Sequence, residues 1–189
     1  VYSVPDADPQ LLGVQERGLP MVLCDQPKNV DVPFVGIDDF HAIQPAAQAL
    51  VDAGHTRVGI LAKRMFSHPT NGLVVDVSAA DLDTQRSRVE GAMEVLGDVP
   101  VVTRHLNDID SAADGARELI ERFGDLTAIL CTTDSMALGV MEYCGGRVPH
   151  ELSVTGFDGI DTRYGLTTVR QPNRQKGEAA AALLRSLID

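Results

Sequence analysis

A strand–helix–strand unit within residues 127–172 constrains the fold of this chain more than any other feature. Residues 128–131 are an apolar run that is too short for a helix and suits a buried strand. Apolar residues at helical spacing follow in residues 136–144, and the pair Gly145-Gly146 ends that helix. Residues 153–157 form a second buried strand. Two strands joined through a helix pair in parallel with a right-handed crossover, so this unit predicts a parallel sheet.

The same alternation of strand and helix runs along the rest of the chain. The clearest helix covers residues 40–53, where Asp38 or Asp39 can cap the start and Gly54 ends it. Pro45 suits this helix only within its first turns, where the missing N–H costs little. The other expected strands are residues 1–4, 21–24, 34–37, 58–62 and 99–103, and the other expected helices are residues 11–17, 84–96, 111–123 and 174–188. We therefore expect an α/β fold built on a parallel sheet.

Composition narrows the classes of protein that fit. Hydrophobic residues make up 44% of the 189 residues, which is enough for a core, and no apolar run approaches the length of a membrane span. A formal charge of −11 argues against this segment itself binding the phosphate backbone of DNA. The first ten residues do not resemble a signal peptide. Cys24, Cys131 and Cys144 lie in apolar segments without metal spacing, which predicts reduced cysteines in a cytoplasmic protein.

Three segments resemble successive signatures of the lac-repressor-type (LacI/GalR) family of bacterial transcription regulators. They are TAILCTTDSMALGV, VPHELSVTGFDGID and LTTVRQP, and they occur in the family's order at nearly its spacing. A fourth, FVGIDDFHAIQPAAQALVDAGHTRVGIL, resembles the opening of the carboxyl-terminal subdomain in that family. The resemblance extends over residues 18–184, apart from a poor match at residues 63–83.

The resemblance implies the type I fold of periplasmic-binding-protein-like domains. By it, residues 1–33 belong to a partial amino-terminal sensor subdomain, residues 34–170 form a nearly complete carboxyl-terminal subdomain, and residues 171–189 return to the first. The chain should then cross between subdomains near residues 25–33 and 168–172. Nothing here resembles the family's helix-turn-helix, so we expect a piece of a longer regulator.

The resemblance also places an effector site in the cleft between the subdomains. The positions that match are Asp25, near the first crossover, Arg88 on a helix, Thr133 where sugar-responsive members usually carry asparagine, Asp158 after the GF strand, and Gln171 in the second crossover. Carboxylates accept hydrogen bonds from paired hydroxyls, and a guanidinium donates to two oxygens, so this combination suits a polyol. No aromatic residue follows the strand at residues 99–103, where several members carry one, so the effector stays unnamed.

Each of these residues also has a purely structural interpretation. Arg88 could be an exposed helix residue, and Asp158 could simply end a strand at an Asp-Gly turn. Thr133 could share the capping of the helix that follows it. Asp134 is expected to be that helix cap rather than a ligand contact.

Residues 63–83 are longer than an ordinary connection between a strand and a helix. Residues 73–77 could add a strand, and the segment could be either a solvated loop or a lid over the effector, since it joins two points at the ligand-binding edge of the sheet. His68 and Asp76 lack the companions that a metal site requires.

The resemblance therefore implies the effector-sensing region of a LacI-type regulator, a cytoplasmic repressor-type homodimer. Its expected partners are a small-molecule effector such as a sugar or related metabolite, and operator DNA bound through a helix-turn-helix outside this segment, with no membrane. We expect no catalysis, metal or cofactor, because phosphate loops, nucleophile elbows and paired-histidine motifs are missing. His55 is expected to be a helix-terminal cation. The alternatives are a sugar-binding transport protein of the same fold and an uncharacterised α/β enzyme.

Overall fold

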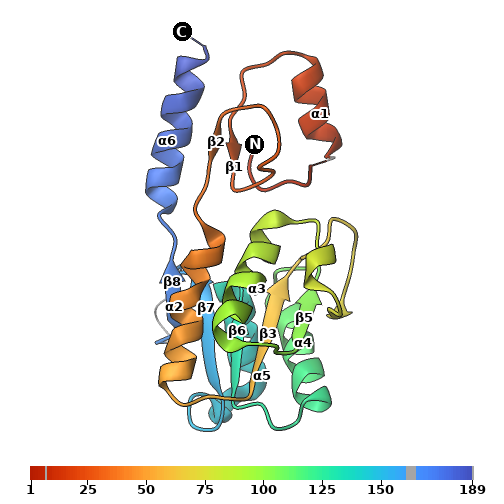
Figure 1. Ribbon diagram of the computed structural model, residues 1–189, viewed down its shortest axis with the longest axis vertical. Coiled ribbons are helices and arrows are strands. Elements are labelled where there is room, and N and C mark those ends of the chain that lie inside the picture. The colour runs from red at the N-terminus through yellow and green to blue at the C-terminus, as the bar shows by residue number, and fades with distance from the viewer. Residues whose placement is uncertain (7, 161–164, 189) are drawn as a thin grey trace.

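The computed structural model describes residues 1–189 except 7, 161–164 and 189, and it contains two α/β units joined by two chain crossings (Figure 1). The larger unit holds a six-stranded sheet in the order β4-β5-β3-β6-β7-β8. Its strands are β3 (Val58–Lys63), β4 (Gly72–Leu73), β5 (Val101–Arg104), β6 (Ala128–Cys131), β7 (Ser153–Asp158) and β8 (Thr167–Arg170). All neighbouring strands pair in parallel except the short edge strand β4, which runs antiparallel to β5. The predicted parallel pair of β6 and β7 is confirmed.

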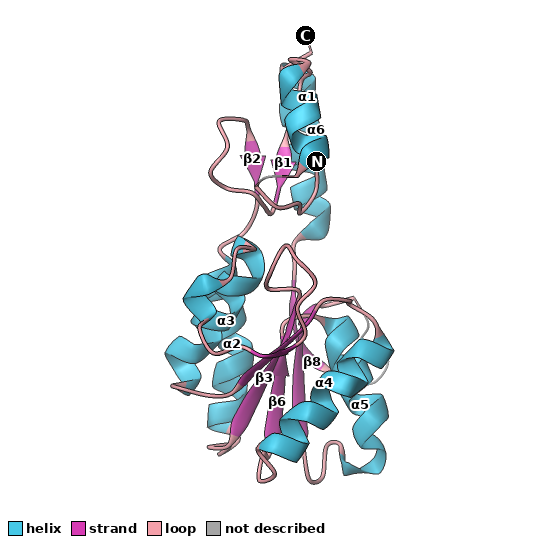
Figure 2. Ribbon diagram, turned by 90° about the vertical axis from the view of Figure 1, so that its right-hand side faces the viewer, coloured by secondary structure: helices cyan, strands magenta, loops and turns pink. Residues whose placement is uncertain are grey.

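Helices cover both faces of this sheet, which makes a three-layer unit (Figure 2). One face carries α2 (Asp39–Asp52) and α3 (Asp83–Leu96), and the other carries α4 (Ile109–Arg122) and α5 (Asp134–Cys144). Two hydrophobic clusters fill the spaces between sheet and helices, one centred on Ile60 and Leu130 and the other on Leu61 and Ile129. Successive residues of each strand thus point to opposite cores, which explains why both strands read as unbroken apolar runs.

Close packing of α2 on α3 depends on one glycine. A Cβ added to Gly91 would lie 2.0 Å from the carbonyl oxygen of Phe40 and 2.9 Å from a methyl group of Ile43. The helices approach each other closely because Gly91 has no side chain. Pro45 lies inside α2, seven residues after its cap at Asp38, and so beyond the first turn where the sequence analysis expected it.

The smaller unit consists of a two-stranded parallel sheet between two helices. Its elements are β1 (Leu23–Cys24), β2 (Phe34–Val35), α1 (Pro9–Glu16) and α6 (Asn173–Ser186). Residues 1–4 join this sheet through a parallel bridge between Tyr2 and Cys24. Leu11, Met21 and Leu23 form its small buried core.

The first chain crossing lies later than expected. The sequence analysis placed it at residues 25–33 and opened the larger unit at residue 34, but Phe34 and Val35 pair with Leu23 and Cys24. The chain therefore crosses at residues 36–38, between β2 and the cap of α2. The apolar pattern of Phe34 and Val35 suits a strand in either sheet, so the sequence could not decide between them. The second crossing follows β8 and leads into α6, within the expected range.

Residues 63–83 form an ordered excursion along the outer edge of the large sheet. Besides β4 they contain the 3-10 helix η1 (Val77–Ala79), and a second such turn, η2 (Gly145–Arg147), follows α5. The Asp81 carboxylate accepts hydrogen bonds from the backbone N–H and the hydroxyl of Ser67, which closes the segment at its base. The added strand that the sequence allowed is thus present as β4, although it spans only two residues. Within the described residues, no helix combines the length and apolarity that crossing a bilayer requires.

Candidate functional site

The candidate site lies where the carboxyl ends of β3, β6 and β7 face the smaller unit (Figure 2). Ligands of open α/β sheets bind at this edge. Two of the expected site residues, Asp25 and Asp158, have backbone φ angles of 67° and 133°. Non-glycine residues adopt such angles at a cost, and that cost recurs at ligand sites.

Arg88 is buried rather than exposed. It lies on α3 and is 3% accessible. Its Nε donates to Oδ1 of Asp39 at 2.9 Å, and its Nη1 donates to the carbonyl oxygen of Thr132 at 2.8 Å. The guanidinium stacks on Phe157, with Cζ 3.8 Å from the ring centroid. These contacts fix the guanidinium in one orientation.

Asp39 was missed as a functional partner. The sequence offered Asp38 or Asp39 as the cap of α2, and the structure assigns the capping to Asp38, whose carboxylate accepts from the N–H of His41. Asp39 is 1% exposed and turns inward to pair with Arg88. Burial raises the pKa of Asp39, and the nearby guanidinium opposes that rise.

Asp158 ends β7 and contacts the second crossing and helix α3. Its Oδ1 accepts a hydrogen bond from Nε2 of Gln171 at 2.6 Å and lies 3.8 Å from Nη1 of Arg88. Burial raises the pKa of Asp158, while Arg88 and the Gln171 hydrogen bond act in the opposite direction. The side chain keeps 20% of its surface exposed, so it can still meet a ligand.

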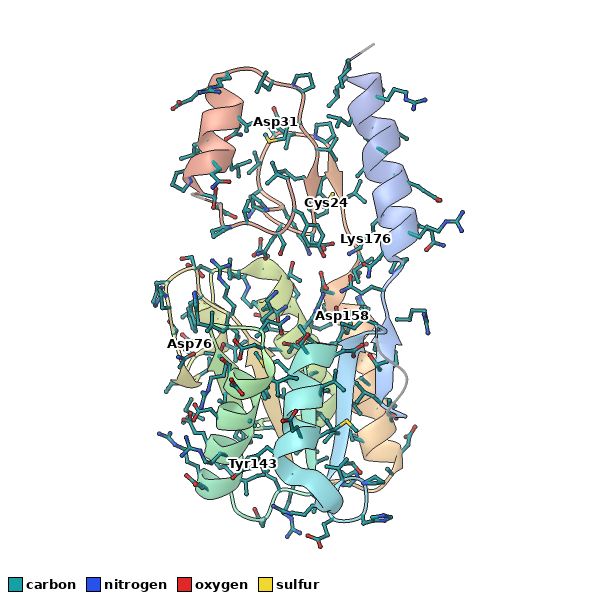
Figure 3. All side chains as sticks on the ribbon, turned by 180° about the vertical axis from the view of Figure 1, so that it is seen from behind. Cys24, Asp31, Asp76, Tyr143, Asp158 and Lys176 are labelled. Carbon is teal, nitrogen blue, oxygen red and sulfur yellow. The ribbon has the colours of Figure 1, made fainter. Side chains whose placement is uncertain are left out.

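Asp25 is held by a lysine that the sequence analysis did not single out. Lys176, in the first turn of α6, donates to both carboxylate oxygens of Asp25 at 2.9 and 3.0 Å and to Oε1 of Gln171 at 2.7 Å. Lys176 is the one buried residue within α6, at 7% exposure. A lysine beside three polar residues in an exposed helix carries no sequence signal that distinguishes it. Figure 3 shows Lys176 on α6 and Asp158 on the facing unit.

The contacts join four of the five expected residues into one series, which we name the polar row. In order, it consists of Asp25, Lys176, Gln171, Asp158, Arg88 and Asp39. The row begins in the smaller unit, passes through the second crossing and ends at Asp39, the first residue of α2. A hollow of about 470 Å³ adjoins its middle, lined by Asp158, Gln171 and residues 159–160, 170 and 172–175. Pockets for small molecules commonly have about this volume, roughly 300–1,000 Å³.

Thr133 lies beside the row rather than in it. Its hydroxyl oxygen accepts from the N–H of Met136, which makes Thr133 the N-cap of α5, and the hydroxyl donates to Oδ1 of Asn107 at 2.7 Å. The expectation that Asp134 caps this helix was wrong. Asp134 is fully buried and accepts from the N–H of Ile160 and the hydroxyl of Thr168, so it ties the end of β7 to β8.

Two further residues near the row were not anticipated. The phenol of Tyr2 lies by the row, where partial burial and the Asp25 carboxylate raise its pKa to about 12. Its ring centroid is 5.9 Å from Nζ of Lys176. Burial lowers the pKa of Lys63, at the end of β3, and the Asp158 carboxylate opposes that shift. Tyr2 supplies an aromatic ring from a part of the chain where the sequence analysis did not look for one.

Two other predictions about titratable groups can be compared with the structure. His55 was expected to be a helix-terminal cation, but its ring bridges the hydroxyls of Thr127 and Ser153, each at 2.9 Å. It therefore joins the starts of β6 and β7. The three cysteines are free thiols, as expected, and Cys131 and Cys144 are buried. Among the described residues, no three metal-ligating side chains come together.

Comparison with known proteins identifies the family. Residues 47–189 match the model of the periplasmic binding protein-like domain. The chain is also 42% identical over 204 residues to the HTH-type transcriptional regulator IpsA of Corynebacterium glutamicum, a match that covers 100% of this chain and 57% of that protein. This chain is a periplasmic binding protein-like domain of the LacI family. It spans little more than half the length of the curated relatives that it matches.

Solved structures agree with this assignment. The crystal structure of a LacI-family regulator from Corynebacterium glutamicum superposes with a TM-score of 0.93 at 42% identity, covering 100% of this chain and 60% of that one. A complex of the transcriptional regulator CelR with cellobiose gives a TM-score of 0.77 at 25% identity, covering 97% of this chain and 57% of that one. The predicted fold class and family resemblance are both confirmed, and the relatives are transcriptional regulators rather than enzymes.

Proposed function

We propose that this domain senses a small polyhydroxylated effector in a cleft between its two units. The observation that carries the proposal is the polar row, which links the units through side chains suited to hydroxyl groups. Asp25 and Asp158 offer carboxylate oxygens, and Arg88 offers a guanidinium fixed by Asp39. Such a combination orients a polyol by accepting from some hydroxyls and donating to others. The bound cellobiose of the CelR complex is a molecule of this class.

The proposed effector residues are Asp25, Arg88, Asp158 and Gln171, with Thr133 at the margin. Asp158 and Gln171 border the hollow directly. Thr133 has its hydroxyl occupied by Asn107 and the N–H of Met136, so its contribution would require exchange of the Asn107 hydrogen bond. For the subdomains, the strand pairing favours a first boundary after Val35 rather than after residue 33.

In the complete protein, we propose that effector binding controls attachment to operator DNA through a helix-turn-helix outside this segment. The relatives named as HTH-type regulators support this role, and so does the charge of −11, which disfavours contact between this segment and DNA. We further propose that the protein works in the cytoplasm, without catalysis and without a metal or other cofactor.

A homodimer is also part of the proposal. Ile109 and Tyr143, on α4 and α5, are 43% and 44% exposed, and a hollow on these two helices is lined by Ile109, Leu138, Met141 and Glu142. An apolar surface shared by two helices suits self-association. Sedimentation equilibrium should give a dimer that Leu138→Glu converts to monomer, and a monomeric wild-type protein would contradict this.

Calorimetry with a panel of neutral sugars that includes cellobiose tests the effector site. At least one sugar should bind, and Asp158→Ala should weaken its binding more than tenfold, since loss of a charge-assisted hydrogen bond costs about 2 kcal/mol. Asp125→Ala is the matched control, because that carboxylate is exposed and pairs only with Arg57 at 3.5 Å within the described residues. Equal affinity for Asp158→Ala and the wild type would place the effector elsewhere.

The alternative is a sugar-binding transport protein of the same fold. It would use the same cleft, so binding experiments do not separate the two. A signal peptide ahead of this segment in the full gene would favour transport, and a helix-turn-helix there would favour the regulator.

A further inference from the structure

The middle of the polar row contains the side-chain amide of Gln171, and one of its two hydrogen-bond partners fixes its orientation. Gln171 has two different ends, because Oε1 only accepts hydrogen bonds and Nε2 only donates them. An amide between two partners can therefore face either way unless a partner forbids one orientation. Lys176 is such a partner, since an ammonium group donates and cannot accept.

The geometry around Lys176 leaves one consistent arrangement. Its Nζ donates to Asp25 Oδ1 at 2.9 Å, Asp25 Oδ2 at 3.0 Å and Gln171 Oε1 at 2.7 Å. With Oε1 turned toward the ammonium, Nε2 must face Asp158, and it donates to Oδ1 there at 2.6 Å. Rotating the amide by half a turn would direct its oxygen at the carboxylate and its NH₂ at the ammonium, two unfavourable pairs at once.

We propose that Lys176 is a positioning residue that fixes the direction of the Gln171 amide and thereby presents Asp158 to the adjoining hollow as an acceptor of hydrogen bonds. Lys176 acts on Asp158 only through Gln171. Lys176 and Asp25 both belong to the smaller unit, whereas Asp158 ends β7 of the larger unit, so Gln171 carries the link from one unit to the other.

The charge state of Asp158 explains why the amide direction matters. Burial already favours the protonated carboxyl, and the groups that oppose this are Arg88 from α3, Gln171 from the second crossing and Lys63 from β3. Asp134 from α5 acts in the same direction as burial. Tyr2, near the chain start, also feels the Asp158 charge. Removing the donor of Gln171 therefore shifts Asp158 further toward a neutral carboxyl, which offers a donor where the ionised form accepts.

A consequence for the ligand follows, and this part alone rests on the proposed function. The ligand group that approaches Asp158 from the hollow must be a hydrogen-bond donor, such as a hydroxyl or an ammonium group. A carboxylate or phosphate at that point would meet an ionised acceptor and be repelled. Lys176 thus contributes to the selectivity for hydrogen-bond-donating ligand groups, although it does not line the hollow.

The test is a double-mutant cycle read by carbon NMR on the ligand-free protein. The side-chain carboxyl signal of Asp158 gives its titration midpoint, and Lys176→Met should raise that midpoint. In a Gln171→Ala background the same Lys176→Met change should leave the midpoint where Gln171→Ala alone puts it. The Gln171 side-chain amide signals should also move in Lys176→Met.

Arg185→Met is the matched control on the same helix. It removes an exposed positive charge in the last turn of α6, outside the lining of the hollow, and the Asp158 midpoint should not change. If Lys176→Met does not fold because it leaves Asp25 unpaired, the cycle is run in an Asp25→Asn host, where both buried charges are removed together.

Two results would overturn the proposal. One is an Asp158 midpoint that is unchanged in Lys176→Met. The other is an equal shift with and without Gln171, which would mean that the lysine charge acts directly through space. Because these signals are recorded without ligand, failure of every sugar to bind would refute the proposed function and leave this result standing.

Discussion

The most decisive stability experiment removes the buried charge of Arg88 while keeping its volume. Arg88→Met leaves Asp39, which is 1% exposed, without the Nε donor at 2.9 Å, and it leaves the carbonyl of Thr132 without Nη1 at 2.8 Å. Removing one partner of a buried ion pair costs about 3–5 kcal/mol, because the other charge stays buried. Methionine is about as long as the apolar part of arginine and should still pack on Phe157, where the guanidinium now stacks, so the loss should report on the charge rather than on a cavity.

Urea denaturation followed by circular dichroism measures the loss, and a double mutant shows its cause. Asp39→Asn combined with Arg88→Met removes both charges, and we expect it to recover about 2 kcal/mol relative to Arg88→Met alone. Arg174→Met, on the exposed surface of α6, should change the free energy of unfolding by less than about 0.5 kcal/mol. A double mutant no more stable than Arg88→Met would refute the reasoning.

The same variant has a defined pH dependence. Burial raises the pKa of Asp39 in the folded protein, and Arg88→Met removes the guanidinium that opposes the rise. A carboxyl whose pKa is raised by folding favours the folded state below its ordinary value of 3.8, and that contribution is lost as the pH rises through the folded pKa. Asp158, which also loses the influence of Arg88, shifts in the same direction. The stability gap between wild type and Arg88→Met should therefore be smaller at pH 4.5 than at pH 7, and a constant gap would contradict this.

Four other outcomes are expected. Gly91→Ala should destabilise the domain by about 3 kcal/mol in thermal denaturation, because its Cβ would overlap the Phe40 carbonyl, whereas Gly177→Ala, which has open space, should not destabilise. Thr133→Ala should cost about 1 kcal/mol through loss of the helix cap, measured in the same way, and an unchanged midpoint would argue against that cap. Residues 1–189 alone should not retard operator DNA in a mobility-shift assay at physiological salt, given the charge of −11. If residues 67–78 act as a lid, their amide hydrogen exchange should slow with saturating effector, and identical exchange would make them a simple loop.

The parts of the fold that the sequence predicted well are those set by local pattern. The strand at residues 128–131 is apolar throughout, and the strand at residues 153–157 is buried at all but its first position, so burial on both faces of the sheet agrees with the predicted pair. The strand at residues 34–35 was given to the wrong unit because two apolar residues carry no information about which sheet they join. A short strand can be assigned to a sheet only once its neighbouring strand is known, and the tertiary structure determines that neighbour.

The residues of the candidate site also divide into those that the sequence predicted and those that it did not. Arg88 and Asp158 were predicted from resemblance, and the structure brings them within 3.8 Å. Lys176 could not be predicted, because its burial arises from a carboxylate 151 residues away. His55 was misjudged for a similar reason, since its two hydroxyl partners lie 72 and 98 residues further along the chain. For charged and polar side chains, the sequence shows which groups can bind or donate, and only the three-dimensional structure shows which residue each one contacts.

The position of α6 directly after the second crossing turns a small local change into a large displacement. Its 14 residues make a rigid rod about 20 Å long, attached at the end that carries Lys176. A rotation of about 10° at that attachment would displace the opposite tip by roughly 4 Å, which exceeds any shift needed to break one hydrogen bond. Figure 1 shows that tip at the end of the molecule farthest from the large sheet. Because α6 packs against β1 and β2, such a rotation at the second crossing would carry the whole smaller unit with it.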